Sequence, residues 1–207
     1  MARTDKRVFL GGSFDPPHIG HLLMAERARE VLKVERVDLL VTATPPHAKP
    51  KKSTANAAQR LAMAKLAIAG NRGLGVDERE LQRKGRSYTI DTVRELLRER
   101  PGVRPVFIIG GDMLADLPTW KDVNTLVELA DFAPVFRPGF GDEVFKGLRA
   151  KLGRDVAARL EKAVIEMPLL EISSTAIRSR IKAGLSVRYL VPDTVRAFID
   201  RENLYGG

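Results

Sequence analysis

Residues 7–21 of the chain read Arg7-Val8-Phe9-Leu10-Gly11-Gly12-Ser13-Phe14-Asp15-Pro16-Pro17-His18-Ile19-Gly20-His21. The apolar run at residues 8–10 favours a buried strand. From residue 19 to residue 32, apolar side chains recur at helical spacing and predict a helix. The stretch therefore predicts a strand, a glycine-rich loop and a helix in direct succession, as at the start of an α/β fold.

The same succession continues along the rest of the chain. We expect further strands at residues 36–43, 74–76, 106–109, 132–136 and 164–167, and helices at 57–69, 87–100, 123–129, 142–160, 173–183 and 192–201. Gly110-Gly111-Asp112 is expected to form another loop at the carboxyl end of a strand. This alternation predicts a Rossmann-like, doubly wound, mostly parallel sheet with helices on both faces. We expect residues 1–207 to form one domain, with a helical C-terminal portion from about residue 173.

The composition is that of an ordinary globular protein. Of 207 residues, 44% are hydrophobic and 29% are charged, and none is cysteine. The lack of cysteine excludes disulfides, thiol catalysis and thiolate metal sites. No apolar run reaches the roughly 18 residues of a membrane helix, and no secretory leader is evident, so we expect a cytoplasmic protein without a membrane partner.

A formal net charge of +9 raises the alternative of a non-catalytic RNA-binding protein. Basic residues are, however, scattered among 26 acidic ones, and the only compact basic patch lies at residues 49–52 in a proline-rich loop. Aromatic residues make up 6% of the chain and form no basic and aromatic stripe. We therefore expect small anionic substrates and no nucleic-acid partner.

The glycine-rich loop has the composition of a phosphate-binding turn. Gly11 and Gly12 are expected to let the backbone turn sharply and approach a ligand closely. The amino-terminus of the following helix attracts anions through its free N–H groups and dipole. His18 and His21 stand three residues apart, on one face of the first helical turn, where both can bind the same phosphate. A metal site is the alternative, but no third ligand of suitable type stands beside the pair at helical spacing.

This loop resembles the G-G-[ST]-F-D-P-x-H-x-G-H signature of the nucleotidylyltransferase superfamily. A second segment, Ile172-Ser173-Ser174-Thr175-Ala176-Ile177-Arg178, is similar to its I-S-S-T-x-I-R signature. Its serines and threonine could be an ordinary helix cap, but a helix start with an arginine one turn later also suits the outer phosphates of ATP. The histidine motif is shared with class I aminoacyl-tRNA synthetases, which the short chain and the lack of a KMSKS-like loop exclude.

Further segments resemble the bacterial nicotinate mononucleotide adenylyltransferase family. They are, in order, Pro45-Pro46-His47 with Lys49, Ser87-Tyr88-Thr89, Gly110-Gly111-Asp112, Thr119-Trp120 and Arg137-Pro138-Gly139. The resemblance implies transfer of AMP from ATP to nicotinate mononucleotide, giving nicotinate adenine dinucleotide and pyrophosphate for NAD biosynthesis. Ala48 departs from the family, which often has Lys or Arg directly after Pro-Pro-His.

The resemblance also implies the roles of individual residues. His18, His21 and Arg178 are expected to be catalytic. The residues expected to bind ATP are Gly11, Gly12, Ser13, Phe14, His18, His21, Gly110, Asp112, Ile172, Ser173, Ser174, Thr175 and Arg178. Those expected to bind the mononucleotide are Ser13, His47, Lys49, Thr89, Trp120 and Arg137.

Several alternatives stay open at this point. Trp120 is the only tryptophan and could be a core residue, and Lys49 could be a solvated loop charge. Sister enzymes use phosphopantetheine or nicotinamide mononucleotide as the acceptor. Mg²⁺ is expected to enter with ATP rather than to bind a protein site. The sequence leaves open whether the chain forms a homo-oligomer.

Overall fold

The computed structural model describes residues 6–43, 55–136, 141–168 and 170–206. A six-stranded sheet forms its centre, with strand order β3-β2-β1-β4-β5-β6 and every neighbouring pair parallel. The strands are β1 (Arg7–Gly12), β2 (Val37–Val41), β3 (Leu74–Asp77), β4 (Pro105–Gly110), β5 (Asp131–Phe136) and β6 (Ile165–Glu166). This order is that of the Rossmann fold, so the predicted fold class is confirmed.

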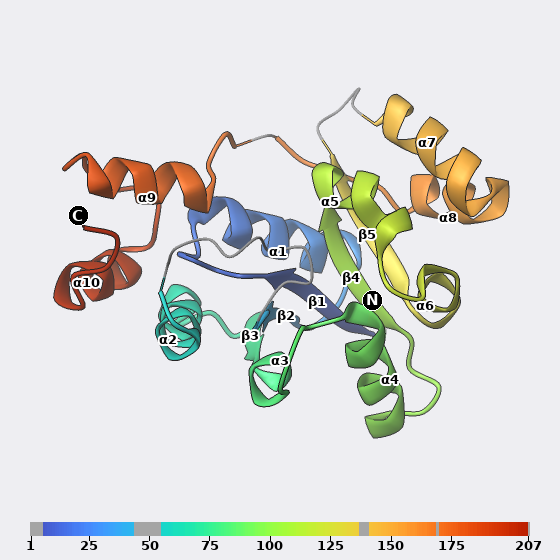
Figure 1. Ribbon diagram of the computed structural model, residues 1–207, viewed down its shortest axis with the longest axis horizontal. Coiled ribbons are helices and arrows are strands. Elements are labelled where there is room, and N and C mark those ends of the chain that lie inside the picture. Colours follow the sequence, from blue (N-terminus) through green and yellow to red (C-terminus); the bar gives the residue numbers. More distant parts are fainter. Residues whose placement is uncertain (1–5, 44–54, 137–140, 169, 207) are drawn as a thin grey trace.

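Helices alternate with these strands along the chain (Figure 1). They are α1 (Ile19–Val31), α2 (Ala57–Ala67), α3 (Arg79–Gln82), α4 (Thr89–Glu99), α5 (Gly111–Asp116), a 3-10 turn (Leu117–Thr119), α6 (Val123–Leu129), α7 (Asp142–Leu152), α8 (Arg154–Lys162), α9 (Ser174–Lys182) and α10 (Asp193–Arg201). No helix in the described ranges is both long and apolar enough to cross a membrane.

Alternate residues of the central strands belong to two separate apolar clusters. Phe9 of β1 and Phe107 of β4 pack with α4, α5, α6, α7 and α8. Val8 and Leu10 of β1 pack instead with Ala25 and Ala28 of α1. Because successive side chains of a strand point to opposite faces, both faces of the sheet are buried under helices. The sheet is therefore doubly wound.

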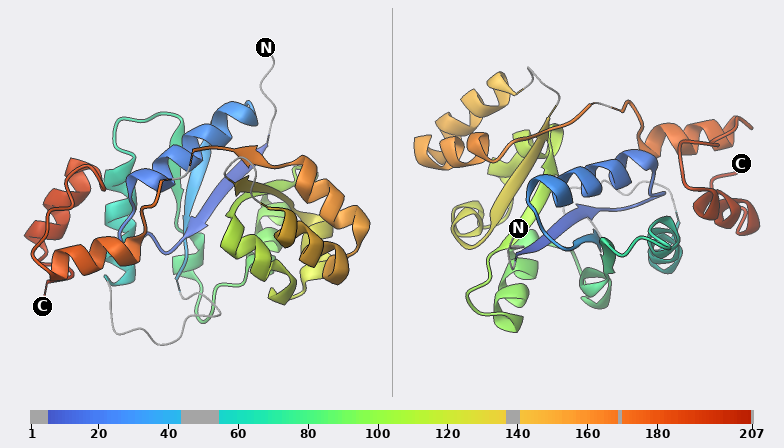
Figure 2. Two further views of the ribbon diagram at one scale, coloured as in Figure 1. Left: turned by 90° about the horizontal axis from the view of Figure 1, so that it is seen from above. Right: turned by 180° about the vertical axis from the view of Figure 1, so that it is seen from behind.

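A third cluster joins the last two helices to α2. Ile177 of α9 and Phe198 of α10 are buried with Met63 of α2. Figure 1 and the rear view in Figure 2 both place α9 and α10 beside α2, at the end of the molecule away from α7 and α8. This packing keeps α9 close to the start of α1, where the glycine-rich loop lies.

Two predicted segments differ from the structure. The loop expected at Gly110-Gly111-Asp112 is absent, because α5 begins at Gly111 directly after β4. The helix expected over residues 142–160 is two helices, divided at Gly153, whose φ of 88° is unsuitable for a continuous right-handed helix. The sequence has a helical pattern on both sides of this glycine, so it predicted one continuous helix.

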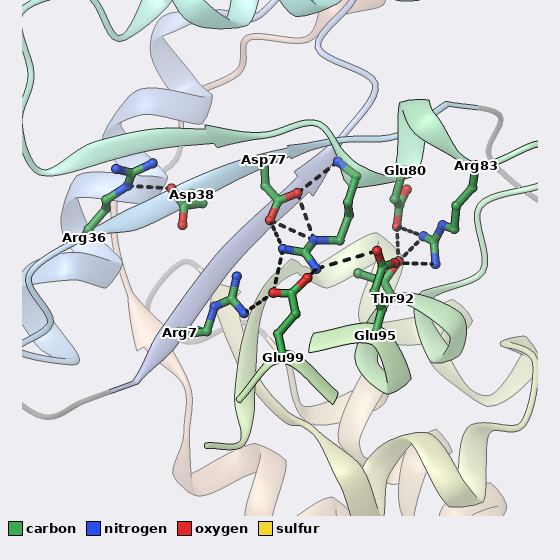
Figure 3. A network of polar contacts seen from close by, with 10 residues as sticks. Arg7, Arg36, Asp38, Asp77, Glu80, Arg83, Thr92, Glu95 and Glu99 are labelled. Atoms are coloured by element: carbon green, nitrogen blue, oxygen red, sulfur yellow. Dashed lines mark hydrogen bonds and ion pairs between the residues drawn. The ribbon is translucent and has the colours of Figure 1, made fainter. Parts of the chain in front are cut away.

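Ion pairs connect helices α3 and α4 to strands β1 and β3 (Figure 3). Arg79 at the start of α3 makes a 2.7 Å ion pair with Asp77 and a 2.6 Å ion pair with Glu99 of α4. Glu99 also pairs with Arg7 of β1 at 2.8 Å. The side chains of Arg79 and Asp77 are each only 11% exposed, so this pair is shielded from water.

Replacing Arg79 with Met should therefore destabilise the fold markedly. Asp77 would lose its cation while staying largely buried, and we expect a loss of about 2 kcal/mol in the free energy of unfolding. Arg36→Met is the matched control. Arg36 is 55% exposed in its pair with Asp38, and its removal should cost less than about 1 kcal/mol. Urea denaturation of both variants measures the difference, and equal losses would contradict the importance of burial.

Candidate active site

The loop after β1 turns at Phe14 and not at the glycines. Gly11 and Gly12 belong to β1, whereas Phe14 has a φ of 48°, in the left-handed region. The Phe14 ring is fully buried, and a Cβ added at Gly12 would lie 3.1 Å from it. Gly12 therefore leaves room for this ring. A Cβ at Gly11 would meet no atom within 4 Å, so the end of β1 is open to close approach by a ligand.

His18 and His21 face each other at the start of α1. Their ring centroids are 3.6 Å apart with an interplanar angle of 27°. The backbone N–H of His18 donates to Nδ1 of His21 at 3.2 Å. In a neutral ring this acceptor role places the proton of His21 on Nε2, which is then free to donate to a ligand.

His18 carries an unsatisfied polar atom. The residue is 6% exposed, and its Nδ1 is the only buried side-chain nitrogen or oxygen without a hydrogen-bond partner among the described residues. Buried polar atoms are nearly always paired, and an exception is often connected with strain, a catalytic role or a bound water or ion. Gly20 belongs to the first turn of α1, and a Cβ there would lie 3.1 Å from this atom, which indicates how closely the helix backbone approaches it.

Both histidines are neutral at physiological pH. Burial lowers the pKa of His18 to about 4. Burial, together with repulsion from His18 when that ring is protonated, lowers the pKa of His21 to about 3. The neutral rings can still donate hydrogen bonds. An anion placed beside them would favour their protonated forms and so raise both pKa values.

Residues of the second predicted motif, 172–178, contact the loop of the first motif. Ser173 is the N-cap of α9, and its Oγ accepts the N–H of Ala176 at 3.1 Å. The Oγ of Ser174 donates to the carbonyl oxygen of Pro16 at 2.8 Å. Nη1 of Arg178 donates to the carbonyl oxygen of Asp15 at 2.7 Å. The amino-termini of α1 and α9 therefore meet across residues 15 and 16.

The remaining residues of the second motif surround this contact. Thr175 is exposed and its Oγ1 accepts a 3.1 Å hydrogen bond from Nη2 of Arg178. Ile172 is partly buried against the cluster of α2, α9 and α10. Ser13 is exposed after β1. These placements bring the predicted phosphate-binding groups to one edge of the sheet.

Two of the segments predicted to bind the acceptor, those of Thr89 and Trp120, lie beside each other. Lys121 joins them, since its Nζ lies 4.5 Å from the centre of the Tyr88 ring and 3.8 Å from Asp91 of α4. Thr89 begins α4, and Trp120 precedes this lysine directly. Trp120 is partly buried and meets the Phe132 ring edge-on at 6.1 Å, so it packs against the core while keeping part of its surface exposed.

The carboxyl ends of β2 and β4 complete the described part of the site. Ser87 Oγ accepts the N–H of Ala43, just after β2, at 3.3 Å. Gly110 ends β4, where an added Cβ would meet no atom within 4 Å, and Asp112 is exposed in the first turn of α5. His47, Lys49 and Arg137 lie outside the described residues.

Two buried charged residues near this edge were not predicted from the sequence. Arg60 of α2, 7% exposed, donates to the carbonyl oxygens of Ser13 at 2.8 Å, Thr42 at 2.7 Å and Ala43 at 3.1 Å. It thus ties the loop after β1 to the end of β2. An arginine facing inward from an otherwise apolar helix face was the only sequence indication of this role.

The second of these residues is Glu80 of α3, which contacts α4. It is 4% exposed and accepts a 2.7 Å hydrogen bond from the Thr92 hydroxyl. Burial raises the pKa of its carboxyl, against the lowering effects of hydrogen bonds from Thr92, Ser87 and Thr42 and of the nearby Arg83 charge. Through Thr92, Glu80 joins α3 to α4, the helix that begins at Thr89.

Within the described ranges, no group of three or more His, Cys, Asp or Glu residues is placed to hold a metal ion. His18 and His21 therefore have no third protein ligand from that part of the chain. Their environment, with adjacent helix amino-termini and Arg178, fits an anion instead.

Comparison with known proteins identifies the family. The model of the cytidylyltransferase-like family matches residues 9–180. A protein of Exiguobacterium sibiricum described as a probable nicotinate-nucleotide adenylyltransferase is 43% identical over 197 residues, covering 95% of this chain and 96% of that protein. A protein of Symbiobacterium thermophilum with the same description is 42% identical over 205 residues, covering 99% of this chain and 96% of its own length.

Solved structures support the same fold. The nicotinic acid mononucleotide adenylyltransferase of Plasmodium falciparum, complexed with NaAD, superposes with a TM-score of 0.73 at 20% identity, covering 97% of both chains. The same enzyme complexed with APC gives a TM-score of 0.75 at 18% identity, covering 98% of both chains. At this identity the likeness concerns the fold, whereas the sequence relatives extend over nearly the whole chain. The chain therefore belongs to the cytidylyltransferase-like family and, within it, to the nicotinate-nucleotide adenylyltransferases.

Proposed function

We propose that this chain transfers the adenylyl group of ATP to nicotinate mononucleotide, giving nicotinate adenine dinucleotide and pyrophosphate. The observation that carries the proposal is the meeting of α1 and α9 at residues 15 and 16. There the unpaired Nδ1 of His18 lies near a helix amino-terminus, and Arg178 lies near a second one. Family membership supports the same reaction.

The chemistry requires no general base. An oxygen of the mononucleotide 5′-phosphate, already anionic, forms a bond to the α-phosphorus of ATP. The bond from this phosphorus to the oxygen bridging to the β-phosphate breaks, and its electron pair leaves with pyrophosphate. No proton moves in this step, so catalysis can rest on in-line positioning and on stabilisation of charge.

We assign the transferred phosphate to the histidines and the leaving phosphates to α9. Neutral His21 would donate from Nε2, and His18 lies stacked on it at 3.6 Å. Ser174 and Arg178 would bind the β- and γ-phosphates, since a guanidinium and a helix amino-terminus both favour phosphate oxygens. Gly11 and Gly110, at the ends of adjacent strands, leave space for the nucleotide.

Nicotinate mononucleotide is proposed to bind beside the start of α4 and the end of the 3-10 turn. Thr89 and Trp120 would contact nicotinate mononucleotide, together with Ser13 and, outside the described residues, His47, Lys49 and Arg137. Asp112 would accept hydrogen bonds from a ribose hydroxyl of the adenosine. Mg²⁺ is proposed to enter with ATP, because phosphate oxygens and water are its preferred ligands. A cytoplasmic location remains part of the proposal.

Pyrophosphate release in the presence of ATP tests the acceptor directly. Nicotinate mononucleotide, nicotinamide mononucleotide and phosphopantetheine should be compared at equal concentrations. We expect the highest kcat/KM with nicotinate mononucleotide and formation of nicotinate adenine dinucleotide in equal amount to pyrophosphate. Preference for either of the other acceptors would contradict the proposed substrate, and release without any acceptor would contradict the reaction.

The lowered histidine pKa values predict a pH-dependent stability. Between about pH 6.5 and pH 4 the unfolded state binds protons that the folded His18 and His21 do not, so the free energy of unfolding should fall as pH falls through this window. Urea denaturation at pH 7, 6, 5 and 4.5 measures the trend.

A nonhydrolysable ATP analogue supplies the control for this prediction. Phosphate beside the rings favours their charged forms, so saturating analogue should reduce the pH dependence in the wild type. The His18→Ala variant should show a weaker pH dependence without the analogue and a smaller response to it. An identical response of both proteins would place the phosphates away from His18.

Gly11→Ala tests whether nucleotide approaches the end of β1. An added methyl group meets no protein atom within 4 Å, so the melting temperature should change by less than about 2 °C. The KM for ATP should nevertheless rise about tenfold or more, since the methyl group would occupy ligand space. Gly147→Ala on α7, where an added Cβ also meets nothing within 4 Å, is the matched control and should leave KM unchanged. Similar kinetics for the two variants would contradict the proposed location.

A further inference from the structure

A buried carboxylate belongs to the first of the two predicted phosphate-binding motifs, next to its contact with the second. Asp15 is 5% exposed. Its Oδ1 accepts the N–H of Ala55 at 3.0 Å and the hydroxyl of Tyr205 at 2.8 Å. Tyr205 is 190 positions from Asp15 in the sequence and belongs to the segment after α10. The C-terminal segment thus reaches back to the first loop of the chain.

The backbone after α10 is shaped to bring Tyr205 to this position. Asn203 and Tyr205 have φ values of 51° and 65°, in the left-handed region that residues other than glycine rarely adopt. The N–H of Leu204 donates to the carbonyl oxygen of Ile199 at 3.0 Å and closes the turn. The Tyr205 ring packs on the cluster of α2, α9 and α10. Such a conformation persists only where surrounding contacts hold it.

Within the described part of the chain, Arg178 is the cation closest to Oδ2, the second oxygen of this carboxylate. It donates from Nη1 to the backbone carbonyl of Asp15 at 2.7 Å, whereas Oδ2 of the same residue is 3.9 Å away. The guanidinium is therefore held by the loop without a direct hydrogen bond to the carboxylate. The two donors on Oδ1 offset part of the negative charge and weaken its attraction for Arg178.

We propose that Tyr205 is a positioning residue for ATP: by donating to Asp15, it keeps Arg178 available to the phosphates instead of in an ion pair with the carboxylate. The inference rests on the proposed role of Arg178 in binding ATP. Without the Tyr205 hydroxyl, Asp15 keeps one donor on its carboxylate, and the Arg178 guanidinium 3.9 Å away is the nearest cation among the described residues. Arg178 then moves toward Asp15 and away from the nucleotide.

Tyr205→Phe tests the proposal, because it keeps the packed ring and removes only the hydroxyl. We expect the KM for ATP to rise about tenfold, the size of one lost hydrogen bond to a charged group. The KM for nicotinate mononucleotide should stay within about twofold of the wild type, since the acceptor does not depend on Arg178. Tyr189→Phe is the matched control. Tyr189 is 82% exposed, and its variant should leave both constants unchanged.

A double-mutant cycle with Arg178→Ala separates positioning from general damage to the fold. In the Arg178→Ala background, Tyr205→Phe should raise the KM for ATP by no further factor, because the side chain on which it acts is gone. A raised KM in Arg178→Ala with an unchanged KM in Tyr205→Phe would overturn the role of Tyr205 alone. Unchanged KM in Arg178→Ala would overturn the assignment of Arg178 and with it this inference.

Replacing the carboxylate provides a rescue experiment. The double variant Asp15→Asn/Tyr205→Phe removes the negative charge that would capture Arg178, so its KM for ATP should be lower than that of Tyr205→Phe. Thermal denaturation of all variants is measured in parallel. If the KM for ATP rises across the variants as the melting temperature falls, whether or not residue 15 is charged, the proposal is contradicted.

Discussion

β1 forms hydrogen bonds with β2 on one side and with β4 on the other, and all three strands run parallel. Their carboxyl ends therefore lie side by side, and the chain must leave β1 and β4 in opposite directions along the sheet. Gly11 and Gly110 lie at this edge of the sheet, near the carboxyl ends of β1 and β4. The loops after β1, β2 and β4 therefore start from one edge, and the predicted site residues of these loops lie there.

Polar side chains from distant helices then fix these loops. Arg60 holds the loop after β1 against the end of β2, Ser174 and Arg178 hold it against α9, and Tyr205 holds it against the C-terminal segment. Most of these groups donate to backbone carbonyls, which a loop cannot pair within itself. The edge proposed to bind phosphate is consequently positioned by hydrogen bonds as well as by apolar packing, and these bonds fix the geometry of its loops.

The parts of this fold that could be predicted from sequence are those with a local pattern. β1 and α1 follow from the apolar spacing around residues 8–32, and the two phosphate motifs follow from residue types that occur together within a few positions. The turn at Phe14 could not be predicted, because glycine is the usual residue at positive φ and two glycines stand beside it. Tyr205 could not be assigned either, since its partner Asp15 is 190 positions away. For Arg60 the only indication was its inward position on an otherwise apolar helix face, which does not reveal its partners 17, 18 and 47 positions away.

The contacts of α9 also bear on the order in which the molecule is assembled. Ser174 meets Pro16 across 158 positions, and all six strands precede α9 in the chain. During synthesis from the amino-terminus, the sheet and the glycine-rich loop can thus form before the helix that completes the phosphate site exists. A polypeptide that ended after β6 would contain all six described strands together with His18 and His21, yet it would lack the predicted second half of the nucleotide site. Formation of the sheet and completion of this predicted site are therefore separable steps for the chain.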